Sequence, residues 1–277
     1  MTFREALQAA TVRLTEAGVP DAPRDARWLL AAAAGVPRDR LSVLAGDALD
    51  PMARERLDDM LARRVKRIPV SQIVGEKSFY GRDFHVDADV LTPRPETETL
   101  VALALSEPFA RVLDMGTGSG AILVTLLAER PQARGVGTDI SAKAALIAGR
   151  NAARHGVADR ITLPLSDWWR DVGSLYDLIV SNPPYIAADE MDALMPEVRD
   201  HEPREALTDE GDGLSAYRSI TAGALDHLTP GGRLIVEIGP SQGQAIQDMF
   251  KAAGLVEVQV HPDLDGRDRV VIGRKPA

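Results

Sequence analysis

The residues with the clearest chemical meaning are the run Ser-Asn-Pro-Pro-Tyr at positions 181–185, which directly follows the apolar segment 176–180. Two consecutive prolines supply no backbone N–H group and fix φ, so the chain can neither continue as a paired strand nor begin a helix there. We expect a stiff, extended loop that holds the amide of Asn182 at one end and the ring of Tyr185 at the other. Such a loop suits the binding of a planar NH2 group between hydrogen-bond acceptors and an aromatic face.

A glycine-rich turn lies earlier in the chain, at positions 112–120, with the sequence Val-Leu-Asp-Met-Gly-Thr-Gly-Ser-Gly. Glycine lets the backbone turn sharply and approach a ligand closely, and open α/β sheets bind ligands at the carboxyl ends of their strands. Alone, this turn could serve a dinucleotide. However, Gly116, Gly118 and Gly120 alternate, whereas the dinucleotide fingerprint places its third glycine later. The turn also lacks the lysine of a phosphate-binding P-loop.

One acidic and one aromatic side chain follow the next two predicted strands. Asp139 comes about twenty residues after the glycines, where a carboxylate can accept hydrogen bonds from both hydroxyls of a ribose. Alternatively, Asp139 caps the following helix, although Ser141 could do so instead. Trp168 could lie against an adenine ring; the alternative is a plain core residue.

Short apolar segments alternate with amphipathic segments from residue 110 onward. Strands are predicted at 111–114, 134–139, 161–165, 176–181, 233–238, 255–260 and 269–273, and helices at 121–129, 142–155, 214–228 and 242–253. This alternation is typical of an α/β fold with a mostly parallel, doubly wound sheet, here of seven strands. Because the last two strands are joined directly, we expect them to form an antiparallel hairpin.

The residues before this region predict two smaller parts. Residues 1–73 predict a helical domain, with a capping box at 2–5, a helix capped by Asp21, a shorter helix near 38–44, and a helix that begins at Asp50 and Pro51. Residues 74–92 predict a β-hairpin connector around Gly81, in which His85 is structural, and residues 93–277 form the main domain. The helical domain is either a packing module or a recognition surface for a protein partner.

Composition excludes several classes of protein. The 277 residues include no cysteine, which excludes disulfides, thiolate metal sites and cysteine nucleophiles, and we predict no metal site. The net charge of −9 argues against nonspecific DNA binding, and the basic run 63–67 is expected to be a solvated helix end. Without a signal peptide or a long apolar segment, we expect a cytoplasmic protein with no membrane span.

The glycine turn, Asp139, Trp168 and the loop at 182–185 follow the first, second, third and fourth predicted strands of the sheet. They should therefore converge on one edge. This order resembles that of the class I methyltransferases, which use S-adenosylmethionine, and Asn-Pro-Pro-Tyr resembles the motif of those that methylate amino groups.

The resemblance suggests how these residues would work. An amide or exocyclic amine shares its lone pair with a neighbouring atom and is a poor nucleophile. We hypothesise that the side-chain oxygen of Asn182 and the carbonyl of Pro183 accept the two N–H bonds, aim the lone pair at the methyl group and favour the developing positive charge. Tyr185 would stack on the acceptor and hold it still.

Further motifs resemble one family, the release factor glutamine methyltransferases (the PrmC or HemK family). They are Thr-Pro-Arg-Pro-Glu-Thr at 92–97, Glu-Pro-Arg-Glu-Ala-Leu at 202–207, Gly-Asp-Gly-Leu at 211–214, Pro-Gly-Gly at 230–232, Glu-Ile-Gly at 237–239 and Gly-Arg-Asp-Arg at 266–269. The likeness runs from the N-terminal helices, which match in character more than in motif, to the last strand.

The resemblance implies an enzyme that methylates the side-chain nitrogen (N5) of the glutamine in the Gly-Gly-Gln motif of class 1 peptide-chain release factors, producing S-adenosylhomocysteine. A monomer that binds no nucleic acid is expected. The positions matching the family's cofactor site are Gly116, Thr117, Gly118, Ser119, Gly120, Asp139, Trp168 and Asn182. Those matching its substrate clamp are Asn182, Pro183, Pro184 and Tyr185. Ser119 stands where family members often have threonine, so the hydroxyl is retained.

Two alternatives belong to other classes. A DNA adenine N6-methyltransferase could use the same loop on a flipped base, but the net charge of −9 and the lack of a DNA-reading region oppose it. A methyltransferase-like binding module without activity would typically have lost Asn182 or the glycine turn, and this chain retains both.

Overall fold

The structure, a computed structural model, describes residues 1–277. The chain divides into two compact units: Met1–Glu76 with Met195–His201, and Lys77–Leu194 with Glu202–Ala277. The boundaries expected at residues 73 and 92 stay a prediction. None of the helices combines the length and the apolar character needed to cross a membrane.

The first unit is a small helical bundle, as predicted. It contains α1 (Phe3–Glu16), α2 (Ala22–Ala34), the 3-10 helix η1 (Arg38–Ser42), α3 (Pro51–Val65) and α4 (Val70–Val74). The capping box is confirmed, because Thr2 and Glu5 exchange backbone-to-side-chain hydrogen bonds. Asp50 likewise caps α3. Asp21 occupies the N-cap position of α2, but its side chain makes no capping hydrogen bond.

A remote segment completes this bundle. Met195–His201, which includes α8 (Pro196–Arg199), contributes Glu197 to a buried cluster of charges. The Arg64 guanidinium lies 2.7 Å from both Asp25 and Glu197, and Arg67 donates two further bonds of 2.7 Å to Glu197. The prediction of a solvated helix end was therefore wrong for Arg64, which is 5% exposed. Burial of a cation requires a partner charge, and that charge comes from a distant part of the chain.

The second unit is built on a seven-stranded sheet with the order β5-β4-β3-β6-β7-β9-β8. The strands are β3 (Arg111–Met115), β4 (Arg134–Thr138), β5 (Ile161–Thr162), β6 (Tyr176–Ser181), β7 (Leu228–Glu237), β8 (Val256–Pro262) and β9 (Asp268–Arg274). Strands β3 to β7 pair in parallel, and β9 pairs antiparallel with both β7 and β8, which confirms the predicted terminal hairpin.

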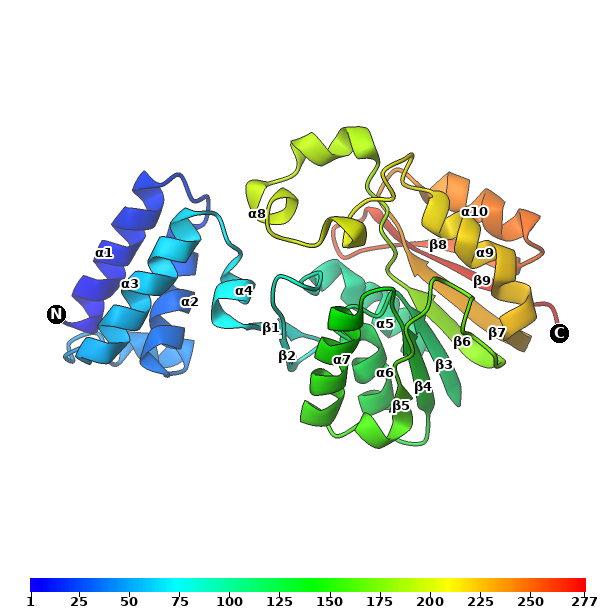
Figure 1. Ribbon diagram of the computed structural model, residues 1–277, viewed down its shortest axis with the longest axis horizontal. Helices are drawn as coiled ribbons and strands as arrows, with labels where there is room; N and C mark the ends of the chain where they lie inside the picture. Colours follow the sequence, from blue (N-terminus) through cyan, green and yellow to red (C-terminus); the bar gives the residue numbers. More distant parts are fainter. The chain divides into compact units, whose positions relative to one another are not determined.

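Alternation along the strands explains the two layers of helices. Val112 of β3 packs in a cluster with α5 (Glu98–Leu105) and α6 (Ala121–Glu129), whereas its neighbour Leu113 packs in a cluster with α9 (Ser215–His227) and α10 (Gly243–Ala252). Successive strand side chains point to opposite faces, so an almost wholly apolar strand needs helices on both sides. Figure 1 shows these helices on the two faces of the sheet, with α7 (Ala142–Arg154) beside α6.

Three parts of this unit depart from the prediction or refine it. The strand expected at 161–165 covers only two residues, although Leu165 makes an isolated bridge to Asp139. The predicted hairpin is present as β1 (Glu76–Phe79) and β2 (Arg82–His85). Residues 186–213, for which the sequence predicts no element, contain the 3-10 helices η4 (Ala188–Ala193) and η5 (Arg204–Ala206) on either side of the segment Met195–His201, which belongs to the first unit.

Gly213 lets this long connection close against the Asn-Pro-Pro-Tyr loop. Its φ is +72°, and a Cβ atom there would lie 2.4 Å from the carbonyl oxygen of Tyr185. Gly231 has nearly the same φ, +74°, but no heavy atom lies within 4 Å of its ideal Cβ position. Alanine substitutions at the two glycines therefore distinguish the energetic cost of a positive φ from the cost of a Cβ atom that clashes with Tyr185.

We expect Gly213→Ala to lower the free energy of unfolding by about 1–3 kcal/mol more than Gly231→Ala does, because only the first change forces the Tyr185 backbone to move. Denaturant unfolding of both variants measures the difference. Equal losses of unfolding free energy in the two variants would contradict this prediction, because the Tyr185 backbone would then move at no energetic cost.

Glu197→Gln should destabilise the helical unit by about 3 kcal/mol, because it leaves buried arginine charge without its partner. Burial alone would raise the Glu197 pKa, but the hydrogen bonds from Arg67 and Arg64 outweigh it and lower the pKa to about 2. A lowered pKa in the folded state means that the stabilisation is complete above the ordinary value of 4.5 and disappears as the pH falls toward about 2.

The difference in unfolding free energy between the wild type and Glu197→Gln should therefore be constant near neutral pH and narrow between about pH 4.5 and pH 2. The control is Glu16→Gln, which removes one charge from an exposed position of the same unit. A difference that stays constant down to pH 2 would contradict this account.

Candidate functional site

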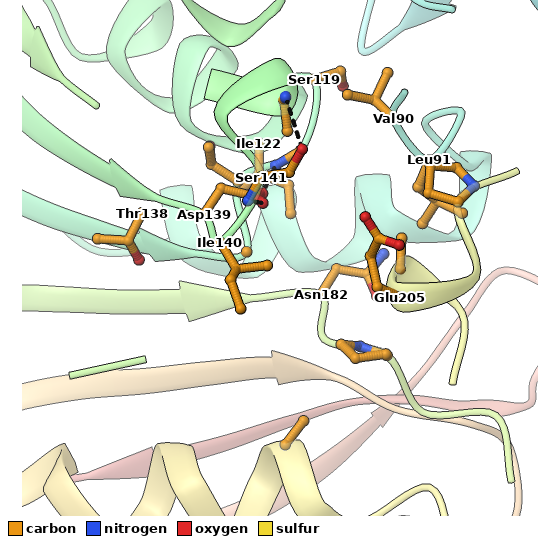
Figure 2. A pocket seen from close by; sticks show the side chains of 18 of the residues that line it. Val90, Leu91, Ser119, Ile122, Thr138, Asp139, Ile140, Ser141, Asn182 and Glu205 are labelled. Atoms are coloured by element: carbon orange, nitrogen blue, oxygen red, sulfur yellow. Dashed lines mark hydrogen bonds between the residues drawn. The ribbon is translucent and has the colours of Figure 1, made fainter. Parts of the chain in front are cut away.

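A cavity of about 610 Å³ lies in the second unit. Its walls are the carboxyl ends of β3, β4 and β6, the segment 89–97 and the segment 203–216. The predicted site residues on its walls are Gly116, Thr117, Gly118, Ser119, Asp139, Trp168, Asn182 and Pro184. Gly120, Pro183 and Tyr185 are not among the lining residues. Figure 2 shows Asp139 and Asn182, which follow β4 and β6 on either side of β3, extending into this region.

The glycine turn forms one wall and is fixed by backbone bonds. The N–H groups of Gly116 and Thr117 both donate to the Thr138 carbonyl at 2.9 Å. Gly116 and Gly118 have positive φ and open space where a Cβ would lie, so the backbone is exposed to a ligand. Gly120 differs, since a Cβ there would lie 3.1 Å from the Ala148 Cβ. Its small size serves the packing of α6 against α7.

Asp139 connects the ends of β3 and β4. Its carboxylate accepts hydrogen bonds from the N–H groups of Gly118 at 2.8 Å and Ser141 at 2.9 Å. Burial raises the pKa of Asp139, although those two N–H groups act in the opposite direction. The N-cap of α7 is Ser141, whose hydroxyl accepts from Ala144 N–H. Asp139 is therefore not needed as a cap, and its remaining lone pairs are available to a ligand.

A second carboxylate, which we did not predict as a site residue, lies beneath the glycine turn. Asp114 is fully buried and accepts a 2.7 Å hydrogen bond from the Thr117 hydroxyl. Its other oxygen has no partner, and burial raises its pKa to about 7. An acidic residue inside an apolar strand was the sequence feature that could have identified it, because such burial is costly without a purpose.

The position of Trp168 fits both of its predicted alternatives, and its contact with an adenine stays a prediction. It lines the cavity, and its ring also packs against the core cluster on the α9 side of the sheet. Its φ of +52° is rare for a bulky side chain and is held in part by the bond from the Ser166 hydroxyl to the Trp168 carbonyl. Unusual backbone conformations of this kind cluster at binding sites.

Asn182 presents an unused acceptor at the cavity wall. Its Nδ2 donates to the Thr97 hydroxyl at 3.3 Å, whereas its Oδ1 is buried without any hydrogen-bond partner. A buried amide oxygen normally has a donor, because the lack of one costs about 1–3 kcal/mol. The arrangement is that of a site prepared for an N–H group.

Tyr185 lies on the other side of the loop. Its ring packs against the cluster that contains Tyr217, and its carbonyl accepts a 2.9 Å bond from the Gln242 side chain. Burial, together with the charge of Glu237, raises the pKa of Tyr185 to about 12. The structure therefore does not bring this ring to the cavity wall.

The charged residues that line the cavity are mainly acidic. Its acidic lining residues are Asp89, Asp139, Asp167, Glu205, Asp209 and Glu210. The two arginines of the wall are each paired with a carboxylate, Arg94 with Glu202 and Arg204 with Glu210. Such a wall favours a ligand with positive charge over an anionic one.

Comparisons with known proteins agree along the whole chain. Residues 5–75 match the family described as the PrmC N-terminal domain, and residues 96–214 match the methyltransferase small domain. A release factor glutamine methyltransferase of Cereibacter sphaeroides is 57% identical over 277 residues, which is 100% of both chains. Another, of Caulobacter vibrioides, is 45% identical and covers 99% of this chain and 97% of its own length.

The fold is shared with more distant proteins. A methyltransferase from Pyrococcus furiosus of known structure has a TM-score of 0.57 at 17% identity, over 78% of this chain and 99% of that one. The identity and coverage of the curated relatives go further than the fold, and the chain belongs to the release factor glutamine methyltransferase family.

Proposed function

We propose that the protein transfers a methyl group from S-adenosylmethionine to the side-chain amide nitrogen of the glutamine in the Gly-Gly-Gln motif of class 1 peptide-chain release factors. The observation that carries the proposal is the buried, unpaired Oδ1 of Asn182 in the wall of the cavity. An acceptor in that position matches the N–H of a primary amide, and the chain's relatives carry the name of this activity.

The residues of the cavity fit S-adenosylmethionine. The open backbone at Gly116 and Gly118 can approach the ligand, and Asp139 has lone pairs for a ribose. Trp168 offers an aromatic surface, and the acidic wall suits a sulfonium and an ammonium group. The cavity volume of about 610 Å³ lies within the range of ligand pockets. When bound, the cofactor supplies an electrophilic methyl group on sulfur.

The loop residues would prepare the glutamine amide for attack. Asn182 Oδ1 accepts one N–H of the substrate, and the Pro183 carbonyl is proposed to accept the other. Together they hold the nitrogen lone pair in one direction and stabilise the positive charge that develops on that nitrogen. No strong base is required before transfer, because the proton can leave afterwards.

Tyr185 receives a different role from the one its sequence position indicates. Because its ring packs against the core and its carbonyl is held by Gln242, we propose that it fixes the loop rather than stacks on the acceptor. Pro184, which lines the cavity, is proposed to contact the substrate side chain. We further propose that the enzyme acts as a monomer in the cytoplasm, on protein rather than nucleic acid.

Asn182→Ala should lower kcat for a release factor by about 100- to 1,000-fold, the usual effect of removing one group that stabilises transition-state charge. Cofactor affinity should change by less than about threefold, because Asp139 and the glycine turn are intact. Methyl transfer from labelled cofactor and calorimetric titration measure the two quantities. Near-normal turnover would remove Asn182 from the mechanism.

The same methyl-transfer assay tests the alternative acceptor, an adenine of DNA. A double-stranded oligonucleotide rich in adenine, offered in place of the release factor, should gain no label. Label on the oligonucleotide and none on the glutamine peptide would replace the proposed function with a DNA adenine methyltransferase.

Asp139→Asn should raise the cofactor Kd by about 10- to 100-fold, since hydrogen bonds to a charged group contribute about 1.5–3 kcal/mol. An asparagine side chain has only one acceptor oxygen, so it cannot accept from the N–H groups of both Gly118 and Ser141. Its NH2 group would face one of these two donors. Asp159→Asn removes one charge from an exposed position of the same unit and is the control. Equal affinities for both variants would remove Asp139 from the cofactor site.

A further inference from the structure

We propose that Thr97 and Glu237 act as a positioning relay, which fixes the amide of Asn182 so that its oxygen, and not its NH2 group, is presented to the substrate. The inference rests on the proposed function and adds two residues to it. Neither belongs to the Asn-Pro-Pro-Tyr loop, and Glu237 does not line the cavity.

Three separate elements bring these side chains together. Thr97 precedes α5, Asn182 follows β6, and Glu237 is the last residue of β7. Thr97 and Glu237 are 4% and 1% exposed. Asn182 Nδ2 donates to the Thr97 hydroxyl oxygen at 3.3 Å. The Thr97 side chain is also the hydrogen-bonding group that lowers the pKa of the Glu237 carboxylate. Thr97 is therefore the link between the loop and a buried acid.

When Glu237 is ionised, the chemistry of the three groups allows only one direction for these bonds. An ionised carboxylate only accepts, and a hydroxyl has a single hydrogen to donate. The Thr97 hydrogen must therefore point to Glu237, and the Thr97 oxygen can only accept from Asn182. If the amide were rotated by 180°, two acceptor oxygens would face each other. The relay thus converts an amide with two possible orientations into a fixed acceptor.

Neither polar group has an evident role in holding the helix or strand in which it lies. Thr97 occupies the N-cap position of α5, but its side chain makes no capping hydrogen bond. Glu237 keeps one carboxylate oxygen without a partner, and burial raises its pKa to about 7 despite the bond from Thr97 and the charge of Arg269. An apolar side chain would fill the position of Glu237 at lower cost. We explain the carboxylate at this position by its effect on Thr97, whose hydroxyl hydrogen it accepts.

The surroundings of Glu237 keep it a candidate for ionisation near neutral pH. Arg269 and Arg94 favour the charged form, whereas Glu96 opposes it. Tyr185 and Tyr217, which interact electrostatically with Glu237, remain neutral, since burial raises the pKa of both.

Thr97→Val keeps the branched shape but removes the hydroxyl. We expect kcat for a release factor to fall about 10- to 100-fold, the effect of a displaced reacting group, while its KM and the cofactor Kd change by less than about threefold. Thr97→Ser, which retains the hydroxyl, should recover most of the lost turnover. Thermal unfolding checks that the valine variant is folded.

A second measurement does not depend on turnover. In the protein without cofactor, the side-chain NH2 of Asn182 should exchange with solvent at least about tenfold faster in Thr97→Val, because its acceptor is gone. The NMR signal is assigned by its disappearance in Asn182→Ala. Unchanged exchange together with unchanged kcat would overturn the relay.

Glu237→Gln tests the direction of action. The variant should also lower kcat by about tenfold or more, since a glutamine amide can donate to Thr97 and reverse the bonds. If Glu237 acts only through Thr97, adding this change to Thr97→Val should lower kcat by less than about twofold further. Independent, multiplicative losses would overturn the relay.

Assays of the wild-type protein distinguish a failure of the relay from a failure of the proposed function. Methylation of the release factor by the wild type, with a fully active Thr97→Val, would overturn the relay and leave the proposed function intact. No methylation of the release factor by the wild type would overturn both.

Discussion

The end of β6 is the constraint on which the site depends. The strand lies in the middle of the sheet, between β3 and β7, and it ends at Ser181, level with the last residue of β3. Pro183 and Pro184 prevent the pairing from going further, because neither has an N–H to donate. Parallel pairing with β3 sets Ser181 beside Met115, so the proline loop begins level with the glycine turn. The glycine turn after β3, in which φ is free, and the proline loop after β6, in which φ is fixed, thus face the same cavity.

Buried acids support this edge of the sheet from below. Asp114 and Glu237 each lie within a largely apolar strand, each has one oxygen without a partner, and burial raises the pKa of each to about 7. Each also bonds to a threonine that lines the cavity, Thr117 or Thr97. The site therefore has a layer of polar groups beneath its visible walls, and such layers hold the contacting groups in place. The buried acids lower the stability of the fold, but they fix the orientation of the side chains that contact them.

The parts of this molecule that follow from short-range rules were predictable. Strand alternation, helix caps at Thr2 and Asp50, and the converging strand ends all depend on residues close in sequence, and the seven-stranded sheet with its final hairpin is confirmed. The chemistry of Asn182 could be hypothesised for the same reason.

What could not be predicted depends on residues far apart in the chain. Thr97 reads as part of a helix start, and Glu237 reads as part of a strand end. Only folding places Thr97 against Asn182, more than eighty residues away in the sequence, and Glu237 within reach of Thr97. The packing of the Tyr185 ring against the core, where a ring stacked on the acceptor was expected, has the same origin. Its surroundings come from α9 and β7, which follow it in the chain.

The path of the chain through the helical unit has a further consequence. Because that unit takes Met195–His201 from the middle of the sheet unit's sequence, the polypeptide crosses between the units at 76–77, at 194–195 and again at 201–202. No single protease cut can release one unit from the other, and a gene fragment ending near residue 76 would encode an incomplete bundle. In such a peptide Arg64 would keep Asp25 but lose its second carboxylate. The two units are compact, but neither is encoded by one continuous stretch of the chain.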